Sequence, residues 1–141
     1  MNPGSAPRYS IGFTSLLDEV SGVPLSVTGI VPPGLVGTMY RIGPGRFQIG
    51  SHTVGHWLDG FALLSSVTFG PHGVTCGNRF LASSWYRRAL TEDALPAGGF
   101  DSSSAHRGSH LSHDNANMNI THWRNELEAL GDTPQRILID S

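Results

Sequence analysis

Short β-branched and apolar segments alternate with glycine- and proline-rich breaks along almost the whole sequence. With 18 glycines and 9 prolines among 141 residues, few stretches are long enough for an uninterrupted helix. Short strands separated by turn residues at intervals of about 8–12 residues are typical of all-β folds. We therefore expect an all-β protein. The predicted strands are Leu25–Val31, Thr38–Gly43, Phe61–Phe69, Val74–Tyr86, Asn115–Trp123, Leu127–Gly131 and Arg136–Asp140.

The breaks predict how these strands are connected. "GPHG" (Gly70–Gly73) is predicted to be a hairpin turn, and "GPG" (Gly43–Gly45) to end the strand before it. Because a glycine inside a strand often marks an irregularity, "CGN" (Cys76–Asn78) predicts a bulge or bend.

Three other regions do not follow the strand pattern. Residues 1–12 are predicted to be a flexible leader, and "FTSLLDEV" (Phe13–Val20) a short helical turn that Gly22 and Pro24 prevent from continuing. Ala89–His110 has the composition of a loop.

Charge and cysteine content exclude several classes of function. The formal net charge is −2, so no basic field favours nucleic acid. Cys76 is the only cysteine, which excludes an internal disulfide and a thiolate metal cluster. No apolar run approaches the roughly 18 residues of a membrane span, and the N-terminus lacks the apolar core of a signal peptide. We expect a cytoplasmic protein, with peripheral contact to a membrane surface left open.

Seven histidines in so short a chain raise the question of a metal site. His52 and His56 have the spacing of two ligands on one helix face, but "TVG" between them favours extended chain. Residues four apart in a strand are about 13 Å apart, too far for two ligands at about 2 Å from one zinc ion. We expect no shared metal at this pair.

His106, His110 and His113 lie in "HRGSHLSH", whose spacing also suits a helix face. Gly108 and the serines favour a loop instead. A loop lacks the rigid support that orients metal ligands, so weak zinc or nickel binding is the alternative to an ordinary polar loop.

The stretch "GHWLDGFALL" (Gly55–Leu64) holds two candidate working groups, His56 and Asp59. Asp-Gly is among the strongest hairpin signals, so Asp59 is predicted to lie in a turn between two strands. Glu126 and Glu128 share one strand face and are expected to be solvated. No G-x-S-x-G nucleophile motif is present, and no self-sufficient active site emerges from the residues alone.

Several segments, in this order, resemble the N-terminal part of the carotenoid cleavage oxygenases. The family's IP-x-x-L-x-G-x-x-x-R-x-GPG-x-F segment is similar to "GIVPPGLVGTMYRIGPGRF" (Gly29–Phe47). Its H-W-F-D-G motif is similar to "HWLDG" (His56–Gly60), and its DNANVNV strand to "DNANMNI" (Asp114–Ile120). The resemblance runs from about Tyr9 to the last residue and is weak across Ala89–His110.

The resemblance implies a fold and a reaction. Family members are seven-bladed β-propellers in which four histidines hold a nonheme Fe(II) on the axis. Iron and O2 cleave a conjugated double bond of a carotenoid or apocarotenoid into two carbonyl products, and neutral imidazole ligands suit iron. We therefore expect a partial β-propeller, made of the first blades, with a short N-terminal helical turn.

The resemblance also implies where the site residues fall. The family's first iron histidine lies beyond the DNAN strand in an AHP-like motif, and none of the seven histidines here matches an iron ligand. His56 matches a histidine that is not a ligand. "ALGDTP" (Ala129–Pro134) resembles an AL-x-E-T segment whose glutamate hydrogen-bonds an iron histidine. The matching residue is Asp132, whose alternative role is only to turn the chain before Pro134.

These resemblances lead to two functional hypotheses. In the first, residues 13–141 are a truncated, inactive N-terminal fragment of a carotenoid or apocarotenoid dioxygenase that does not bind Fe(II) alone. In the second, the chain is a non-catalytic interaction module that pairs through open sheet edges with a complementing chain.

Overall fold

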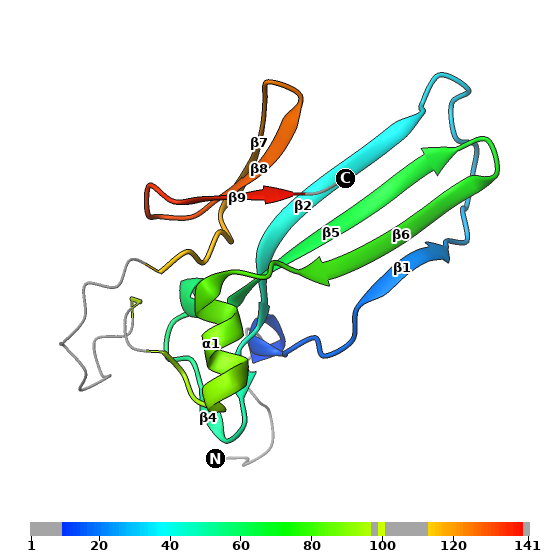
Figure 1. Ribbon diagram of the computed structural model, residues 1–141. Helices are drawn as coiled ribbons and strands as arrows, with labels where there is room; N and C mark the ends of the chain where they lie inside the picture. Colours follow the sequence, from blue (N-terminus) through cyan, green and yellow to red (C-terminus); the bar gives the residue numbers. More distant parts are fainter. Residues whose placement is uncertain (1–9, 97–98, 101–112, 140–141) are drawn as a thin grey trace, which may run out of the picture.

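The computed structural model describes residues 10–96, 99–100 and 113–139. These residues form three antiparallel sheets and one α-helix (Figure 1). The sheets do not close on one another, as expected of part of a propeller. The elements are η1 (Ser10–Phe13), β1 (Val20–Pro24), β2 (Gly37–Arg46), β3 (Gln48–Ile49), β4 (His52–Thr53), η2 (Trp57–Asp59), β5 (Phe61–Gly70), β6 (Gly73–Phe80), α1 (Ser84–Glu92), β7 (Asn119–Trp123), β8 (Glu126–Leu130) and β9 (Arg136–Ile139).

The largest sheet has four strands in the order β1-β6-β5-β2. Its central hairpin joins β5 and β6 through the predicted turn, with Gly70 paired to Gly73. Gly73 has φ 119°, a conformation that favours glycine. The irregularity predicted at Cys76–Asn78 lies on the partner strand: β1 has an extra residue between Val20 and Val23, while β6 stays regular.

The second sheet contains β7, β8 and β9 in chain order. The turn between β7 and β8 is made by Arg124 and Asn125, with φ 52° and 65°. Two consecutive positive φ values give the twist that a two-residue hairpin needs. The three predicted strands are confirmed, although the first begins at Asn119 instead of Asn115.

The N-terminal predictions were wrong in detail. The helical turn is a 3-10 helix at Ser10–Phe13, before the predicted Phe13–Val20, and the first strand is Val20–Pro24. The predicted strand Leu25–Val31 is irregular chain. Gly29, with φ 100°, bends this chain away from an extended course.

Strand β2 does not end at the "GPG" segment as predicted. It continues through Gly43–Gly45 to Arg46. Pro44 pairs with Ala62 and Arg46 with Phe61, so one extra residue bulges out of the ladder. A bulge accommodates a proline inside a strand because the ladder hydrogen bond is already interrupted there.

Helix α1 occupies a segment that was predicted to be strand as far as Tyr86. The Ser83 side chain accepts a hydrogen bond from the Tyr86 N–H and caps the helix N-terminus. Trp85, Tyr86 and Ala89 are buried and share one face of the helix. Burial of this face against β5 stabilises the helix despite its aromatic residues.

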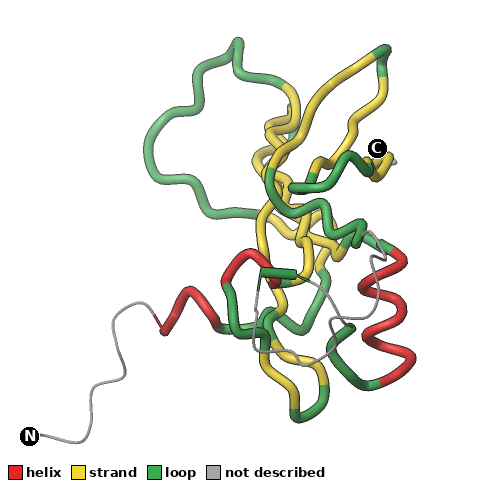
Figure 2. Tube along the Cα trace, turned by 90° about the vertical axis from the view of Figure 1, so that its left-hand side faces the viewer, coloured by secondary structure: helices red, strands yellow, loops and turns green. Residues whose placement is uncertain are grey.

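Strand β5 separates two hydrophobic clusters. Successive residues of a strand point to opposite faces, and Phe61 and Ala62 contribute to different clusters. Phe61 packs under α1, with ring centroids 5.1 Å from those of Trp85 and Tyr86. Figure 2 shows α1 (red) to one side of the strands (yellow). The other cluster joins β5 to the second sheet through Ala62, Leu64, Leu81, Ala116, Ala129 and Ile139.

Candidate functional site

The one residue to which a site role was assigned, Asp132, lies in the turn that follows β8. Its Oδ1 atom is 3.7 Å from Nε2 of His113, and its side chain is 32% exposed. Thr133, next in the same turn, donates a hydrogen bond from its hydroxyl to the His113 carbonyl at 3.0 Å. The turn is thus attached to the chain just before the DNAN segment.

His113 is largely buried between this turn and α1. Its ring lies 5.3 Å from that of Trp85, and its side chain is 13% exposed. The contact between His113 and Asp132 is within ion-pair distance but longer than a hydrogen bond.

The DNAN segment contributes three side chains that join the two sheets and the helix, and we call Asp114, Asn115 and Asn117 the DNAN clamp. Asp114 accepts hydrogen bonds from the Ser84 N–H (2.6 Å, Oδ2) and the Trp85 N–H (2.9 Å, Oδ1). These N–H groups belong to the first turn of α1, which has no intrahelical acceptor for them. Partial burial raises the pKa of the Asp114 carboxyl, but the hydrogen bonds from Trp85 and Ser84 outweigh it and lower the pKa below its ordinary value.

Asn115 and Asn117 attach the same segment to β5 and the residues before it. Asn115 accepts from the Ala62 N–H (3.0 Å) and donates to the Gly60 carbonyl (3.0 Å). Asn117 donates from Nδ2 to the carbonyls of Leu58 and Gly60, both at 2.8 Å. Both amides are buried, 2% and 5% exposed. The DNAN motif therefore contacts the HWLDG motif directly, which no sequence spacing could indicate.

Asp59 is not in a two-residue hairpin turn, so that prediction was wrong. It ends the 3-10 helix η2 and is 5% exposed. Its Oδ1 atom accepts a hydrogen bond from the Phe100 N–H at 2.8 Å. His56 caps the same helix by accepting from the Leu58 N–H, and its ring stacks on that of Phe100 at 5.1 Å. Both candidate working groups therefore hold backbone in place.

The candidate metal residues do not converge within the part of the chain that the structure describes. No three His, Cys, Asp or Glu side chains among those residues are close enough to hold a metal ion. His52 is exposed on β4 and His56 lies beyond it. His106 and His110 lie outside the described residues. The four-histidine iron site that the resemblance implies is therefore not assembled by residues 10–96, 99–100 and 113–139.

Glu128 differs from the solvated residue that was predicted. It is 8% exposed on β8 and accepts a hydrogen bond from Nη1 of Arg136 at 3.0 Å. The neighbouring strand β9 supplies this arginine, because Leu130 pairs with Arg136 and Glu128 with Leu138. The pair places a positive charge beside a carboxylate that is largely buried, on the strand face opposite Ala129.

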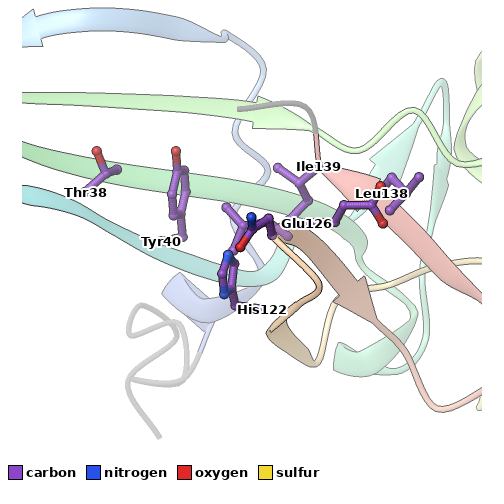
Figure 3. A pocket seen from close by; sticks show the side chains of 8 residues that line it. Thr38, Tyr40, His122, Glu126, Leu138 and Ile139 are labelled. Atoms are coloured by element: carbon purple, nitrogen blue, oxygen red, sulfur yellow. The ribbon is translucent and has the colours of Figure 1, made fainter.

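A cavity of about 680 Å³ opens between β2 and the second sheet. Figure 3 shows the lining residues Thr38 and Tyr40 on β2 to one side, and His122, Glu126, Leu138 and Ile139 of β7, β8 and β9 to the other. Its single histidine and single glutamate do not form a metal site. The mixture of hydroxyl, amide and aliphatic groups assigns no reaction to it.

A model of one protein family, described as retinal pigment epithelial membrane protein, matches residues 13–141. The chain belongs to this family, the carotenoid oxygenases. The matched range includes the three sheets, α1, the DNAN clamp and Asp132. The propeller architecture expected of the chain is also that of its structural neighbours.

Solved carotenoid oxygenases share the backbone of the chain. The apocarotenoid oxygenase of Synechocystis, in a variant with glutamine in place of one glutamate, has a TM-score of 0.76 at 28% identity. That alignment covers 94% of this chain and 29% of the solved one. A chimera of this enzyme with RPE65 gives a TM-score of 0.78 at 26% identity, covering 92% and 28%.

Curated relatives match over a shorter stretch. The mitochondrial carotenoid-cleaving dioxygenases of Macaca fascicularis and Homo sapiens are each 36% identical over 75 residues, 53% of this chain. The match covers 14% and 13% of their own lengths. The chain thus spans less than a third of the family members it resembles. No helix among its described residues is long and apolar enough to cross a membrane.

Proposed function

We propose that residues 13–141 are the N-terminal part of the propeller of an enzyme that cleaves a polyene double bond of a carotenoid or apocarotenoid with Fe(II) and O2. The family match over residues 13–141 carries this proposal. A backbone shared with an apocarotenoid oxygenase at a TM-score of 0.76 supports it. Residues 1–12 precede the matched region and have no role in the proposal.

We propose that the iron chemistry requires residues beyond this chain. The described residues hold no group of three metal ligands, whereas the resemblance calls for four histidines. The contribution of this chain is structural and electrostatic. The DNAN clamp fixes β7 and β8 against β5 and α1, and β8 leads to the turn that carries Asp132.

In this proposal Asp132 orients a histidine by accepting the hydrogen bond from its free ring N–H. An ionised carboxylate has about four acceptor sites. The distance of 3.7 Å to His113 Nε2 is longer than a strong charge-assisted hydrogen bond, and a third of the side chain is exposed. Acceptor capacity therefore remains. Loss of such an outer partner typically costs about 10–100-fold in metal affinity or activity.

A chimera tests the function. Residues 13–141 would replace the matching segment of the Synechocystis apocarotenoid oxygenase, and iron content and cleavage of an apocarotenal would be measured. We expect an iron-loaded chimera that cleaves the substrate. Asp132→Ala should lower activity by about 10–100-fold, Asp132→Glu should retain it, and Asp18→Ala, at an exposed position, is the control. A folded, iron-loaded chimera without cleavage would contradict the proposal.

A second candidate function is favoured by the open sheet edges. Among the described residues, strand β1 has β6 on one side only, and β9 has β8 on one side only. Val20, Val23 and Leu138 on these strands are 39%, 40% and 58% exposed. Apolar edge strands favour pairing with another chain. Size-exclusion chromatography with light scattering separates the candidates, because a cooperatively folding monomer at all concentrations would exclude the interaction module.

We also propose that the connection between β1 and β2 makes peripheral contact with a membrane surface. No charged residue occurs between Glu19 and Arg41, and the connection exposes large apolar side chains. Ile30 and Val36 are the most exposed, at 93% and 72%. Such surfaces partition into lipid. Ile30→Asp should abolish sedimentation with phosphatidylcholine vesicles, whereas Leu90→Asp on α1, also at an exposed apolar residue, should not. Equal sedimentation of both variants would exclude the contact.

A further inference from the structure

A second cavity, of about 520 Å³, lies beside the end of β2, and neither the DNAN clamp nor Asp132 lines it. This volume is within the range of about 300–1,000 Å³ that small-molecule sites occupy. Its apolar wall consists of Phe13, Leu17 and Phe47, and its polar wall includes Arg46, Ser15 and Thr53. None of the residues that line it is acidic.

Arg46 is the charged group of this cavity, and two contacts fix its position. Nε donates to the Gln48 carbonyl at 3.1 Å, and Nη1 donates to the hydroxyl of Tyr86 at 3.2 Å. Tyr86 is a buried member of the core under α1, so it anchors the guanidinium on a rigid element. Arginine has five N–H donors; these two contacts use two, and three are left for a bound group.

No acidic side chain balances this charge within the described part of the chain. The ion pairs among those residues involve Arg88, His113 and Arg136 and do not include Arg46. The carboxylate of Asp93 packs against Gly50, one of the lining residues, but Asp93 is exposed and does not line the cavity. A fixed guanidinium with free donors and no counter-ion attracts an anion with two oxygens, such as a carboxylate.

A neighbouring hydroxyl can join such a contact. The Ser15 Oγ atom accepts a hydrogen bond from the Phe47 N–H at 2.9 Å. Its own O–H therefore remains a donor. The rings of Phe13 and Phe47 lie 5.4 Å apart beside it, and Leu17 is 67% exposed. Anion donors and an apolar surface thus meet in one cavity.

We propose that this cavity binds a carboxylate that carries a short apolar tail. The carboxylate contacts Arg46 and Ser15, and the tail covers the exposed side chains of Phe13 and Leu17. This inference is independent of the proposed carotenoid cleavage, since it uses none of the residues assigned to that function.

Binding of octanoate to the chain would be measured by amide chemical shifts and by calorimetry. Octanol, which lacks the carboxylate, and acetate, which lacks the long tail, are the two controls. We expect octanoate to shift the resonances of Ser15, Arg46 and Thr53, and octanol and acetate to bind at least about tenfold more weakly, which is about 1.4 kcal/mol. Equal binding of octanoate and octanol would overturn the proposal. Absence of octanoate binding to the folded chain would also overturn it.

Variants locate the site. Arg46→Gln should weaken octanoate binding about tenfold or more, and Arg46→Lys should weaken it less because the charge is kept. Arg41→Gln is the matched control, since Arg41 is exposed on β2 and does not line the cavity. Unchanged binding in a folded Arg46→Gln variant would place octanoate elsewhere and refute the assignment. If Arg46→Gln fails to fold, Arg46→Lys and the octanoate–octanol comparison still decide.

Discussion

Asn117 offers the sharpest test of the DNAN clamp. Its Nδ2 group donates to the carbonyls of Leu58 and Gly60, each at 2.8 Å, and the side chain is 5% exposed. Asn117→Asp preserves the shape of the side chain but replaces the donor with a carboxylate oxygen. Two carbonyl oxygens would then face a negative charge in a buried place.

The magnitude follows from the partners that remain. The Gly60 carbonyl keeps the hydrogen bond from Asn115, whereas the Leu58 carbonyl loses its side-chain donor. A buried acceptor without a partner costs about 1–3 kcal/mol, and an uncompensated buried charge costs several more. We expect a loss of about 3–5 kcal/mol in the free energy of unfolding, a large part of the roughly 5–15 kcal/mol of a typical domain.

Urea unfolding measures this loss. With a slope of about 1–3 kcal/mol per molar urea, the midpoint should fall by about 2 M. Asn119→Asp is the matched control, because Asn119 is exposed and its side-chain oxygen only accepts, from the Ile120 N–H. The loss in Asn117→Asp should shrink below about pH 4, where a neutral carboxyl can donate. Equal midpoints for the two variants would refute the clamp.

Three further changes test other parts of the structure by the same unfolding measurement. The pKa of Asp114 is lowered in the folded state, so its stabilisation is present above the unfolded value of about 3.9 and is lost as pH falls through the folded pKa. Asp114→Asn should therefore cost about 1–2 kcal/mol of unfolding free energy at pH 7 and much less at pH 3. A cost that stays constant between the two pH values would contradict this. Gly60→Ala should cost about 1–3 kcal/mol, because its Cβ would lie 2.6 Å from a Phe47 ring carbon, whereas Gly34→Ala, in open space, should cost less than about 0.5 kcal/mol. Phe61→Ala removes a fully buried ring and should cost about 3–5 kcal/mol; a loss below about 1 kcal/mol would contradict the packing under α1.

Local patterns predicted several hairpins correctly, but the one expected at Asp59–Gly60 was wrong. The turn at Gly70–Gly73 and the strands Glu126–Leu130 and Arg136–Ile139 follow from alternation and turn residues. These features depend on neighbours within about ten residues. The all-β class was predicted for the same reason.

Features that depend on distant partners were not predictable. The segment Ser83–Glu92 has aromatic residues that favour strand, but Asp114, 30 residues beyond Ser84, satisfies the N–H groups of its first turn. Glu128 was expected in solvent because its partner, Arg136, comes from another strand. Tertiary contacts override local preference in both cases.

The candidate site was predictable only in part. The HWLDG and DNAN motifs were identified, but their mutual contact through Asn115 and Asn117 was not. Asp132 was assigned from resemblance alone, and sequence gave no sign that His113 would face it. Geometry within loops depends on packing that no periodic pattern records.

The central claim is tested most directly by loading the 141-residue protein anaerobically with Fe(II) and measuring the iron bound per chain. Cleavage of an apocarotenal by the loaded protein is measured alongside. If the catalytic centre requires residues beyond this chain, iron should stay well below one per chain, and the polyene absorbance of the substrate should not decay. One iron per chain together with catalytic loss of that absorbance would contradict the account.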